Sequence, residues 1–333
     1  MKSIIGMGNA LTDFLINLKT DDVLDRFGLP RGSMNLVDSR MQRRIGEHVA
    51  DLQRTLSVGG SASNTIRAMA RLGMKAGYIG KVGKDTTGDF FEQALVNLGI
   101  EPRIFRGTEK SGRCIALVSP DGERTMCTFL GAALELSRTE LTDDIFDGYD
   151  CLYIEGYLVQ DHELIRHAVS RAKALGLTVA IDLASFNIVE ENLGFLQELV
   201  DRYVDIVFAN EQEAFSFTGE KNPLEALDRI GRRCTLAVVK AGTRGAYIKY
   251  RGKVDHVGIM AAARRVDTTG AGDFYAAGFL YGFCKGLSMI QCGTIGAITA
   301  GKVIEVTGTT LSEEAWADVA RWIENVEKGS CLF

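Results

Sequence analysis

The stretch RRVDTTGAGDFYAAGFLYGF (264–283) decides how this chain of 333 residues is interpreted. It contains a glycine-rich turn, 268–272, followed directly by a run whose apolar residues recur at helical spacing. Backbone N–H groups in the first turn of a helix have no intrahelical partner, and the helix dipole adds partial positive charge there. We therefore expect this turn to bind an anion such as a phosphate. Asp273 would lie beside that anion, or it would only cap the helix.

Upstream of this turn, short apolar runs alternate with longer amphipathic stretches. The runs predicted to be strands are 151–156, 177–183, 205–210 and 235–242. The stretches predicted to be helices are 162–175, 191–202, 211–219 and 222–233, followed by three more near 271–286, 288–305 and 312–328. This alternation is typical of an α/β fold, with a mainly parallel sheet between helices. We identify no linker or repeat and expect one domain over residues 1–333.

The first half of the chain breaks this pattern. Residues 112–130 form two strand-like runs around Pro120-Asp121-Gly122, which is a strong hairpin signal. Residues 12–18 and 33–38 are also strand-like and too close together for crossover helices. We expect a small antiparallel sheet, inserted into the α/β core and built from segments near 12–18, 33–38 and 104–130. It could be a lid over a ligand or a dimer interface, and both alternatives remain open.

The composition excludes several classes of protein. Hydrophobic residues make up 46% of the chain and charged residues 24%, so it is neither disordered nor fibrous. The formal charge of -5, with no basic block to offset it, argues against a nucleic-acid partner, and RMQRR (40–44) is expected to be an exposed helix face. Seven cysteines without a CxxC pattern indicate reduced thiols. No apolar run approaches the roughly 20 residues of a membrane span, so we expect a cytoplasmic protein without a membrane partner.

Three other glycine patterns compete with the turn at 268–272. Residues 296–303 resemble a P-loop, but Val303 replaces the required Ser or Thr and the run is apolar and helical, so we reject it. Residues 3–11 contain a Gly-x-Gly pair, but the third glycine position holds Leu11, which leaves only a weak dinucleotide signal. KAGTRGAY (240–247) lies between two predicted strands and would be a hairpin turn or a nucleotide-facing loop.

A second polar helix start supports ligand binding. In SVGGSASNTIRAMARLG (57–73), Gly59 and Gly60 precede a predicted helix and Asn64 lies on its first turns. Ser and Asn are good helix caps and also good hydrogen-bonding groups for hydroxyls. This segment is therefore either an ordinary N-cap or a sugar-binding helix start.

Together these segments resemble the ribokinase-like carbohydrate kinases, the PfkB family. GGSASNTIRAMARLG (59–73) is similar to the first signature of that family, and DTTGAGDFYAAGF (267–279) to its more specific second signature. NEQE (210–213) resembles the Asn-x-x-Glu motif, and KAGTRGA (240–246) the nucleotide-side loop. The resemblance covers essentially the whole chain, and it implies a three-layer α/β/α core with a small β-sheet lid.

The resemblance also implies an ATP-dependent phosphotransferase and a set of site residues. Asp273 would be the general base that takes a proton from a primary hydroxyl of the substrate. The anion hole for the transferring phosphoryl group would consist of the N–H groups of Gly270, Ala271 and Gly272. The residues implied to bind the substrate are Asn9, Asp13, Gly59, Gly60 and Asn64. Those implied to bind the nucleotide are Asn210, Lys240, Thr243 and Gly245, with Glu213 orienting Mg²⁺ through water.

The implied cofactors are ATP and Mg²⁺, and carbonyls near 267–269 are candidates for a monovalent cation such as K⁺. GNALTD (8–13), TFLGAAL (128–134) and VIEVTGT (303–309) are more similar to the adenosine kinase branch than to ribokinase or fructokinase. A nucleoside would need an apolar surface for its base, which could be supplied by Met34, Leu36, Phe129 and Leu130.

Other functions remain as alternatives. They are a sugar kinase of the ribokinase or fructokinase type, a nucleotide or sugar sensor on the same fold, and a dinucleotide-dependent oxidoreductase. The complete DTTGAGD turn (267–273) argues against a sensor, because binding alone needs no base. The expected assembly is a monomer or a lid-mediated homodimer.

Overall fold

The larger of two sheets in the computed structural model has nine strands, in the order β14-β13-β12-β11-β10-β9-β1-β5-β6. The structure describes residues 3–262 and 264–329. The strands of this sheet are β1 (Ser3–Met7), β5 (Lys75–Val82), β6 (Glu101–Arg106), β9 (Cys151–Glu155), β10 (Thr178–Asp182), β11 (Ile206–Asn210), β12 (Leu236–Lys240), β13 (Ala246–Tyr250) and β14 (Lys253–Val257). All neighbours pair in parallel except β12 with β13 and β13 with β14. The mainly parallel sheet expected from the sequence is therefore confirmed.

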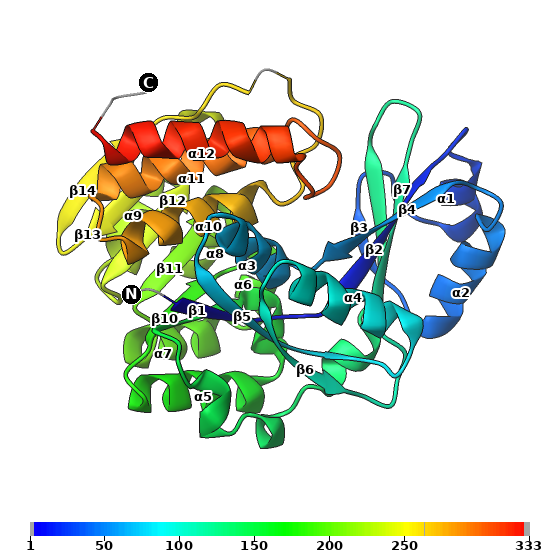
Figure 1. The fold of residues 1–333 in the computed structure, drawn as a ribbon, viewed down its shortest axis with the longest axis horizontal. Coiled ribbons are helices and arrows are strands. Elements are labelled where there is room, and N and C mark those ends of the chain that lie inside the picture. The colour runs from blue at the N-terminus through cyan, green and yellow to red at the C-terminus, as the bar shows by residue number, and fades with distance from the viewer. Residues whose placement is uncertain (1–2, 263, 330–333) are drawn as a thin grey trace.

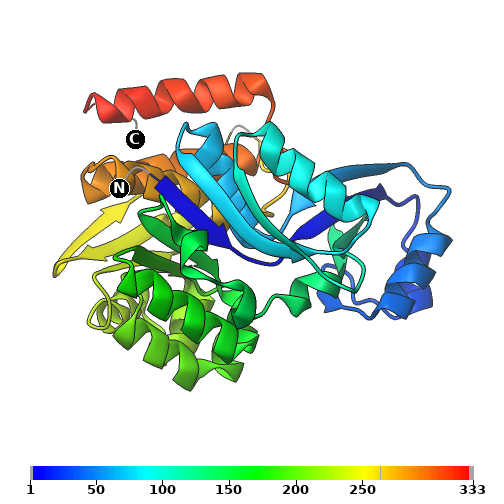
Figure 2. The same cartoon turned by 60° about the horizontal axis from the view of Figure 1, so that its bottom comes forward.

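Alternate residues of the central strands pack against two different helix layers, because side chains of a strand point to opposite faces in turn. In β11, Phe208 packs with one layer and Val207 with the other. The first layer consists of α3 (Ser61–Arg71), α4 (Thr86–Asn97), α10 (Ala271–Cys284) and α11 (Met289–Val303), with α12 (Glu313–Glu327) outside α11. The second consists of α5 (His162–Ala174), α6 (Phe186–Glu191), α7 (Leu193–Arg202), α8 (Glu211–Thr218) and α9 (Pro223–Ile230). Figures 1 and 2 show the sheet between these layers, which confirms the three-layer core.

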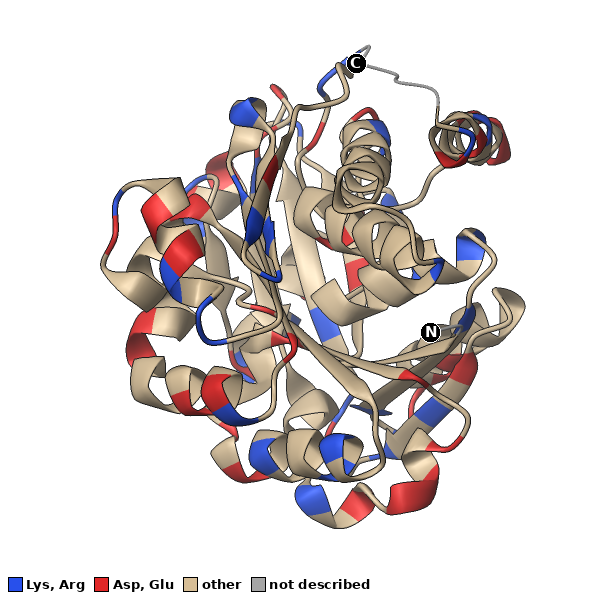
Figure 3. Ribbon diagram, turned by 90° about the vertical axis from the view of Figure 1, so that its left-hand side faces the viewer, with Lys and Arg blue, Asp and Glu red and all other residues tan. Residues whose placement is uncertain are grey.

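Every helix and strand predicted between residues 151 and 328 is present, with ends that differ by about three residues at most. The predicted helix 191–202 corresponds to α7, and α6 was not predicted. Short 3₁₀ helices lie at Gly131–Glu135, Arg138–Glu140, Asp143–Phe146, Gly156–Gln160 and Gly242–Arg244. Within the described ranges no helix is long and apolar enough to cross a membrane. Figure 3, in which the left-hand side of Figure 1 faces the viewer, shows acidic and basic residues interspersed along the helices.

Five strands form a second, smaller sheet beside the core (Figure 1), in the order β3-β8-β7-β2-β4. They are β2 (Leu11–Asn17), β3 (Met34–Leu36), β4 (Arg54–Gly59), β7 (Gly112–Val118) and β8 (Arg124–Phe129). Two helices, α1 (Asp22–Phe27) and α2 (Ser39–His48), pack against one face. Residues 40, 43 and 44 of the RMQRR segment are exposed on α2, as expected.

The small sheet differs from the sequence-based expectation in two ways. It is mixed rather than antiparallel, because β2 pairs in parallel with β7 and β3 pairs in parallel with β8. Strands β2 and β7 follow β1 and β6, which run in the same direction in the large sheet, so they also run the same way. The third expected segment of the small sheet, 104–130, also starts too early. Its first residues belong to β6, which pairs with β5 in the large sheet. Strand β4 was not anticipated.

The order in which strands are added to the large sheet reverses between β1 and β9. From β1 the chain adds β5 and β6 on one side, and it then adds β9 to β12 on the other. In open α/β sheets, ligands bind outside the carboxyl ends of the strands at such a switch point. The fold therefore directs the search for a site to the carboxyl ends of β1 and β9.

An ion pair connects the small sheet to the turn before α10. The guanidinium of Arg124, on β8, lies 2.7 Å from the Asp267 carboxylate, and each side chain is only 10% exposed. The same carboxylate accepts the N–H groups of Thr269 at 3.0 Å and Gly308 at 2.7 Å. Asp267 thus joins the β7–β8 hairpin to two loops of the core.

We expect Arg124→Met to destabilise the folded protein by about 3 kcal/mol, because it leaves a buried carboxylate without its counter-ion. Urea unfolding measures the loss. The double variant Arg124→Met/Asp267→Asn should recover part of it. Arg31→Met is the matched control, since its ion pairs with Asp21 and Asp121 are exposed and should contribute little. Equal losses in the two single variants would contradict the prediction.

Candidate active site

Polar side chains terminate neighbouring strands of the large sheet at one edge. Strand β9 ends at Glu155, β10 at Asp182, β11 at Asn210 and β12 at Lys240, and Asn9 follows β1. The carboxyl ends of parallel strands meet at the same edge, so these side chains gather at the switch point. The first turns of α3 and α10 meet there as well, through hydrogen bonds between their side chains. We identify this edge as the candidate active site.

The turn before α10 has the backbone geometry of an anion site. Gly270 has a φ of +76°, which favours glycine, and a Cβ at this position would lie 2.5 Å from the side chain of Thr309. The N–H of Ala271 donates to the Thr268 carbonyl at 3.2 Å, so it is already used within the turn. The N–H groups of Gly270 and Gly272 have no acceptor among the described residues. Of the three predicted anion-hole N–H groups, those of Gly270 and Gly272 are thus free of a protein acceptor among the described residues, whereas that of Ala271 is engaged within the turn.

Asp273 is held by α3 and does not cap its own helix. One carboxylate oxygen accepts the Ser61 hydroxyl at 2.6 Å, and the other accepts the Asn64 side-chain amide at 2.9 Å. Burial raises the pKa of Asp273 to about 7, although these two hydrogen bonds oppose the rise. The carboxylate is therefore poised to exchange a proton near neutral pH, as a general base requires.

The predicted substrate residues divide into two groups. Asp13 lies against the backbone of Gly59, where only a glycine leaves room for its carboxylate. Burial raises the pKa of Asp13 to about 7, while the charges of Arg67 and Arg124 lower it. Its carboxylate makes no hydrogen bond to any described residue, so it is available to a ligand.

Most polar groups of the remaining predicted substrate residues are engaged within the protein. The exception is the buried side-chain oxygen of Asn9, which has no hydrogen-bond partner among the described residues. The Asn64 amide is bonded to Asp273, and its oxygen accepts the Thr309 hydroxyl at 2.9 Å. Gly60 has a φ of +88°, and a Cβ there would collide with the carbonyl of Asn9. Asn64 and Gly60 therefore help to shape the site, and their contact with a substrate stays a prediction.

Glu155 is a site residue that the sequence analysis missed. It is almost fully buried, and its oxygens accept three hydrogen bonds of 2.8 Å, from the backbone and the side-chain amide of Asn9 and from the N–H of Ala62. Burial raises its pKa, and these bonds lower it in part. Glu155 thereby fixes Asn9 to the start of α3. The available signal was a lone carboxylate at the end of an apolar strand, and the same signal marks Asp182.

Among the residues predicted to bind the nucleotide and its metal ion, Asn210 and Glu213 bind each other as a helix cap. The Asn210 backbone N–H and side-chain amide donate to Glu213 at 2.7 and 2.6 Å, and the Asn210 oxygen accepts the Glu213 N–H at 2.9 Å. Burial, together with the charge of Asp182, raises the pKa of Glu213 to about 7. Thr243 is exposed in the β12–β13 connection, and Gly245 closes that turn with a φ of +82°.

The residues fit a hydrated Mg²⁺ better than a directly ligated one. In residues 3–262 and 264–329 no group of three or more His, Cys, Asp or Glu side chains could hold a metal ion. Mg²⁺ retains several waters in most protein sites. The carboxylates of Asp182 and Glu213 would therefore meet the ion through its water molecules.

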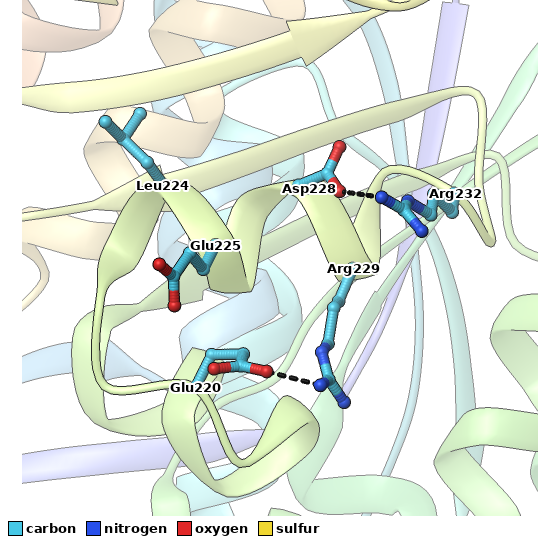
Figure 4. A pocket seen from close by; sticks show the side chains of 6 residues that line it. All are labelled: Glu220, Leu224, Glu225, Asp228, Arg229 and Arg232. Carbon is cyan, nitrogen blue, oxygen red and sulfur yellow. Dashed lines mark ion pairs between the residues drawn. The ribbon is translucent and has the colours of Figure 1, made fainter.

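A surface pocket on α9 is a weaker candidate (Figure 4). It is lined by Glu220, Leu224, Glu225, Asp228, Arg229 and Arg232. Its charged groups pair with one another, in Glu220–Arg229 and Asp228–Arg232. None of the strand-end residues described above lines this pocket, and we assign it no function.

Comparison with known proteins gives consistent matches. A model described as pfkB family carbohydrate kinase matches residues 33–316. A probable sugar kinase structure from Rhizobium etli is 32% identical with a TM-score of 0.87, covering 96% of this chain and 98% of that one. The structure of adenosine kinase from Sinorhizobium meliloti is 33% identical with a TM-score of 0.86, covering 96% and 99%. A nucleoside kinase of Methanocaldococcus jannaschii is 26% identical over 329 residues, or 98% of each chain.

We expect Ser61→Ala to raise the pKa of Asp273 above about 7, because it removes a hydrogen bond to the ionised form. A ¹³C NMR titration of the Asp273 carboxyl carbon, assigned with Asp273→Asn, measures the shift. The matched control is Ser63→Ala, since the Ser63 hydroxyl donates to the Gly59 carbonyl instead. A pKa that is unchanged or lowered in Ser61→Ala would contradict this account.

Proposed function

This chain belongs to the pfkB family of carbohydrate kinases, and we propose that it transfers the γ-phosphoryl group of ATP to the primary hydroxyl of a nucleoside. Kinase activity toward sugars or nucleosides follows from the family and its relatives. The choice of a nucleoside and the roles of individual residues are the proposal. The position of Asp273, in the first turn of α10 and hydrogen-bonded to the first turn of α3, carries it.

In the proposed reaction Asp273 accepts the proton of the substrate hydroxyl. The resulting oxygen attacks the γ-phosphorus, and the bond to the leaving oxygen of ADP breaks. The N–H groups of Gly270 and Gly272 stabilise the negative charge on the transferring group. Bound Mg²⁺ supplies charge neutralisation to the ATP phosphates, and Asp182 and Glu213 would hold its waters.

Asp13 supports a substrate with neighbouring hydroxyl groups. Its carboxylate has no protein hydrogen-bond partner among the described residues and lies at the rim of the same site, against Gly59. A carboxylate accepts two hydroxyl hydrogens at once, as a ribose would offer. Asp13 would therefore orient the sugar ring so that its primary hydroxyl reaches Asp273.

The register of the small sheet supports a base-binding surface on the face that carries Asp13. Leu15 shares that face, and its row continues through the paired residues Ala116, Met126 and Met34. A Cβ on Gly308, in the core, would lie 3.9 Å from the side chain of Leu15. This face is therefore turned toward the core, whereas the opposite face packs against α1 and α2.

Two apolar side chains on this face are largely exposed, Met34 at 50% and Leu36 at 60%. A free sugar would leave them in water, whereas a purine or pyrimidine would cover them. Phe129, which the sequence analysis grouped with them, pairs with Arg113, one residue out of step with the Asp13 row. It therefore belongs to the other face, and we omit it from the base-binding surface.

We expect Mg-ATP and a panel of nucleosides and five- and six-carbon sugars to give a nucleoside 5′-monophosphate. Asp273→Asn should lower kcat by about 10²–10⁴-fold, the usual contribution of a general base, while nucleotide still raises the Tm. Turnover of sugars alone would overturn the nucleoside proposal. ATP binding without any turnover of the panel would favour the sensor.

The rate should also depend on pH. Since a protonated carboxyl cannot accept a proton, kcat/KM should fall as the pH drops below about 7, the pKa of Asp273. Asp13 and Glu213 titrate in the same range, so the profile of the wild type alone is ambiguous. The variant Ser61→Ala identifies the group. The acidic limb of the kcat/KM profile of this variant should move to higher pH, because the pKa of Asp273 rises. An unmoved limb would contradict the role of Asp273.

A further inference from the structure

The ammonium of Lys240 lies against the turn that begins α10. It lies 2.7 Å from a carboxylate oxygen of Asp182, and the two side chains are 16% and 7% exposed. A Cβ on Gly272 would lie 3.1 Å from Lys240 Nζ. The ammonium is therefore located between the end of β10 and Gly272, whose backbone N–H has no acceptor among the described residues.

Three carboxylates surround this ammonium. Asp182 bonds to it directly, and Glu213 and Asp273 lie close enough for their charges to favour its protonated form. Burial lowers the pKa of Lys240, but these carboxylates more than compensate and the pKa is raised. Lys240 is consequently a cation held within an acidic cluster, next to the position where phosphate would bind.

Asp182 is itself fixed in orientation. Its second carboxylate oxygen accepts the N–H of Ala184 at 3.1 Å. Ala184 has a φ of +68°, an unusual backbone conformation for a residue with a side chain. A strained backbone at this point keeps one oxygen engaged and directs the other at Lys240.

We propose that Lys240 is a catalytic residue that contacts the transferring phosphoryl group, and that Asp182 is the positioning residue that holds its ammonium beside Gly272. This inference rests on the proposed kinase reaction and adds a cation to the backbone N–H groups of the anion hole. A lysine acts there as a mobile point charge, whereas the N–H groups are fixed. Charge develops on the phosphoryl oxygens in the transition state, so a cation at this distance stabilises it directly.

A purely structural role for the Lys240–Asp182 pair is the alternative, and the chain offers a matched control. Lys249, on β13, is similarly buried and pairs with Asp228 at 2.6 Å. Neither residue is among the strand-end residues of the candidate site. Asp228 is more exposed than Asp182, at 44% against 7%, so the two lysines are matched and the carboxylates are not. Lys249→Met therefore reports what the loss of a buried lysine from an ion pair does to folding alone.

The test compares Lys240→Met, Lys240→Arg and Lys249→Met with the wild type. Lys240→Met should lower kcat by about 10²–10³-fold, the effect of removing one transition-state donor. It should also weaken binding of a non-hydrolysable ATP analogue more than binding of ADP, measured by calorimetry, because only the former carries a γ-phosphate. Lys240→Arg should recover part of both losses, and Lys249→Met should change neither by more than about twofold.

Asp182→Asn tests the positioning role. It keeps the side-chain shape and removes the charge that stabilises the ammonium, so the alkaline limb of kcat/KM should move to lower pH. An unmoved limb would overturn the role of Asp182. Lys240→Met with kcat within about twofold of the wild type, or with equal losses of analogue and ADP affinity, would overturn the role of Lys240. If the wild type phosphorylates nothing in the panel, the proposed function fails, whereas the comparison of analogue and ADP still decides whether Lys240 contacts the γ-phosphate.

Discussion

The two hydrogen bonds from α3 to Asp273 are the interaction on which the rest of the site depends. They bring together the first turns of two helices that are more than 200 residues apart in the sequence. The start of α3 is in turn fixed by Glu155, which accepts the N–H of Ala62 while also binding Asn9. Strands β1 and β9 and helices α3 and α10 are therefore joined by a few buried polar contacts at the switch point of the sheet.

Burial disfavours the charged form of a carboxylate, and at this site the resulting shift in pKa is useful for proton transfer. Burial raises the pKa of Asp13, Glu213 and Asp273, each to about 7. Surface carboxylates are ionised well below this range and are weak proton acceptors. A carboxylate that titrates near neutral pH exchanges protons readily, so the enclosure that disfavours charge also creates a useful base.

Much of the fold and part of the site could be predicted from the sequence, and the division has physical causes. The alternation of apolar strands with amphipathic helices after residue 151 is a local signal, and the predicted elements are present. The direction of strands in the small sheet is not local: it depends on β1 and β6 running the same way, which no short window of sequence encodes.

At the site, glycine-rich helix starts identified α3 and α10 because their chemistry is visible in a few adjacent residues. Glu155 and Asp182 were missed because each is a single carboxylate at the end of an apolar run, and its importance comes from partners far along the chain. The sequence also did not show that the Ala271 N–H and the Asn64 side chain already have partners within the protein. Whether an N–H or an amide is already occupied depends on the three-dimensional structure alone.

The Arg124–Asp267 ion pair connects the small sheet directly to the DTTGAGD turn (267–273). Arg124 lies on the hairpin, and Asp267 is the first residue of the DTTGAGD turn. A ligand that contacts the small sheet and a ligand that contacts the turn therefore share an energetic connection. Such coupling is reciprocal: by whatever factor the first ligand changes the affinity of the second, the second changes the affinity of the first. The two substrates of this fold are thus expected to bind synergistically or antagonistically, rather than independently.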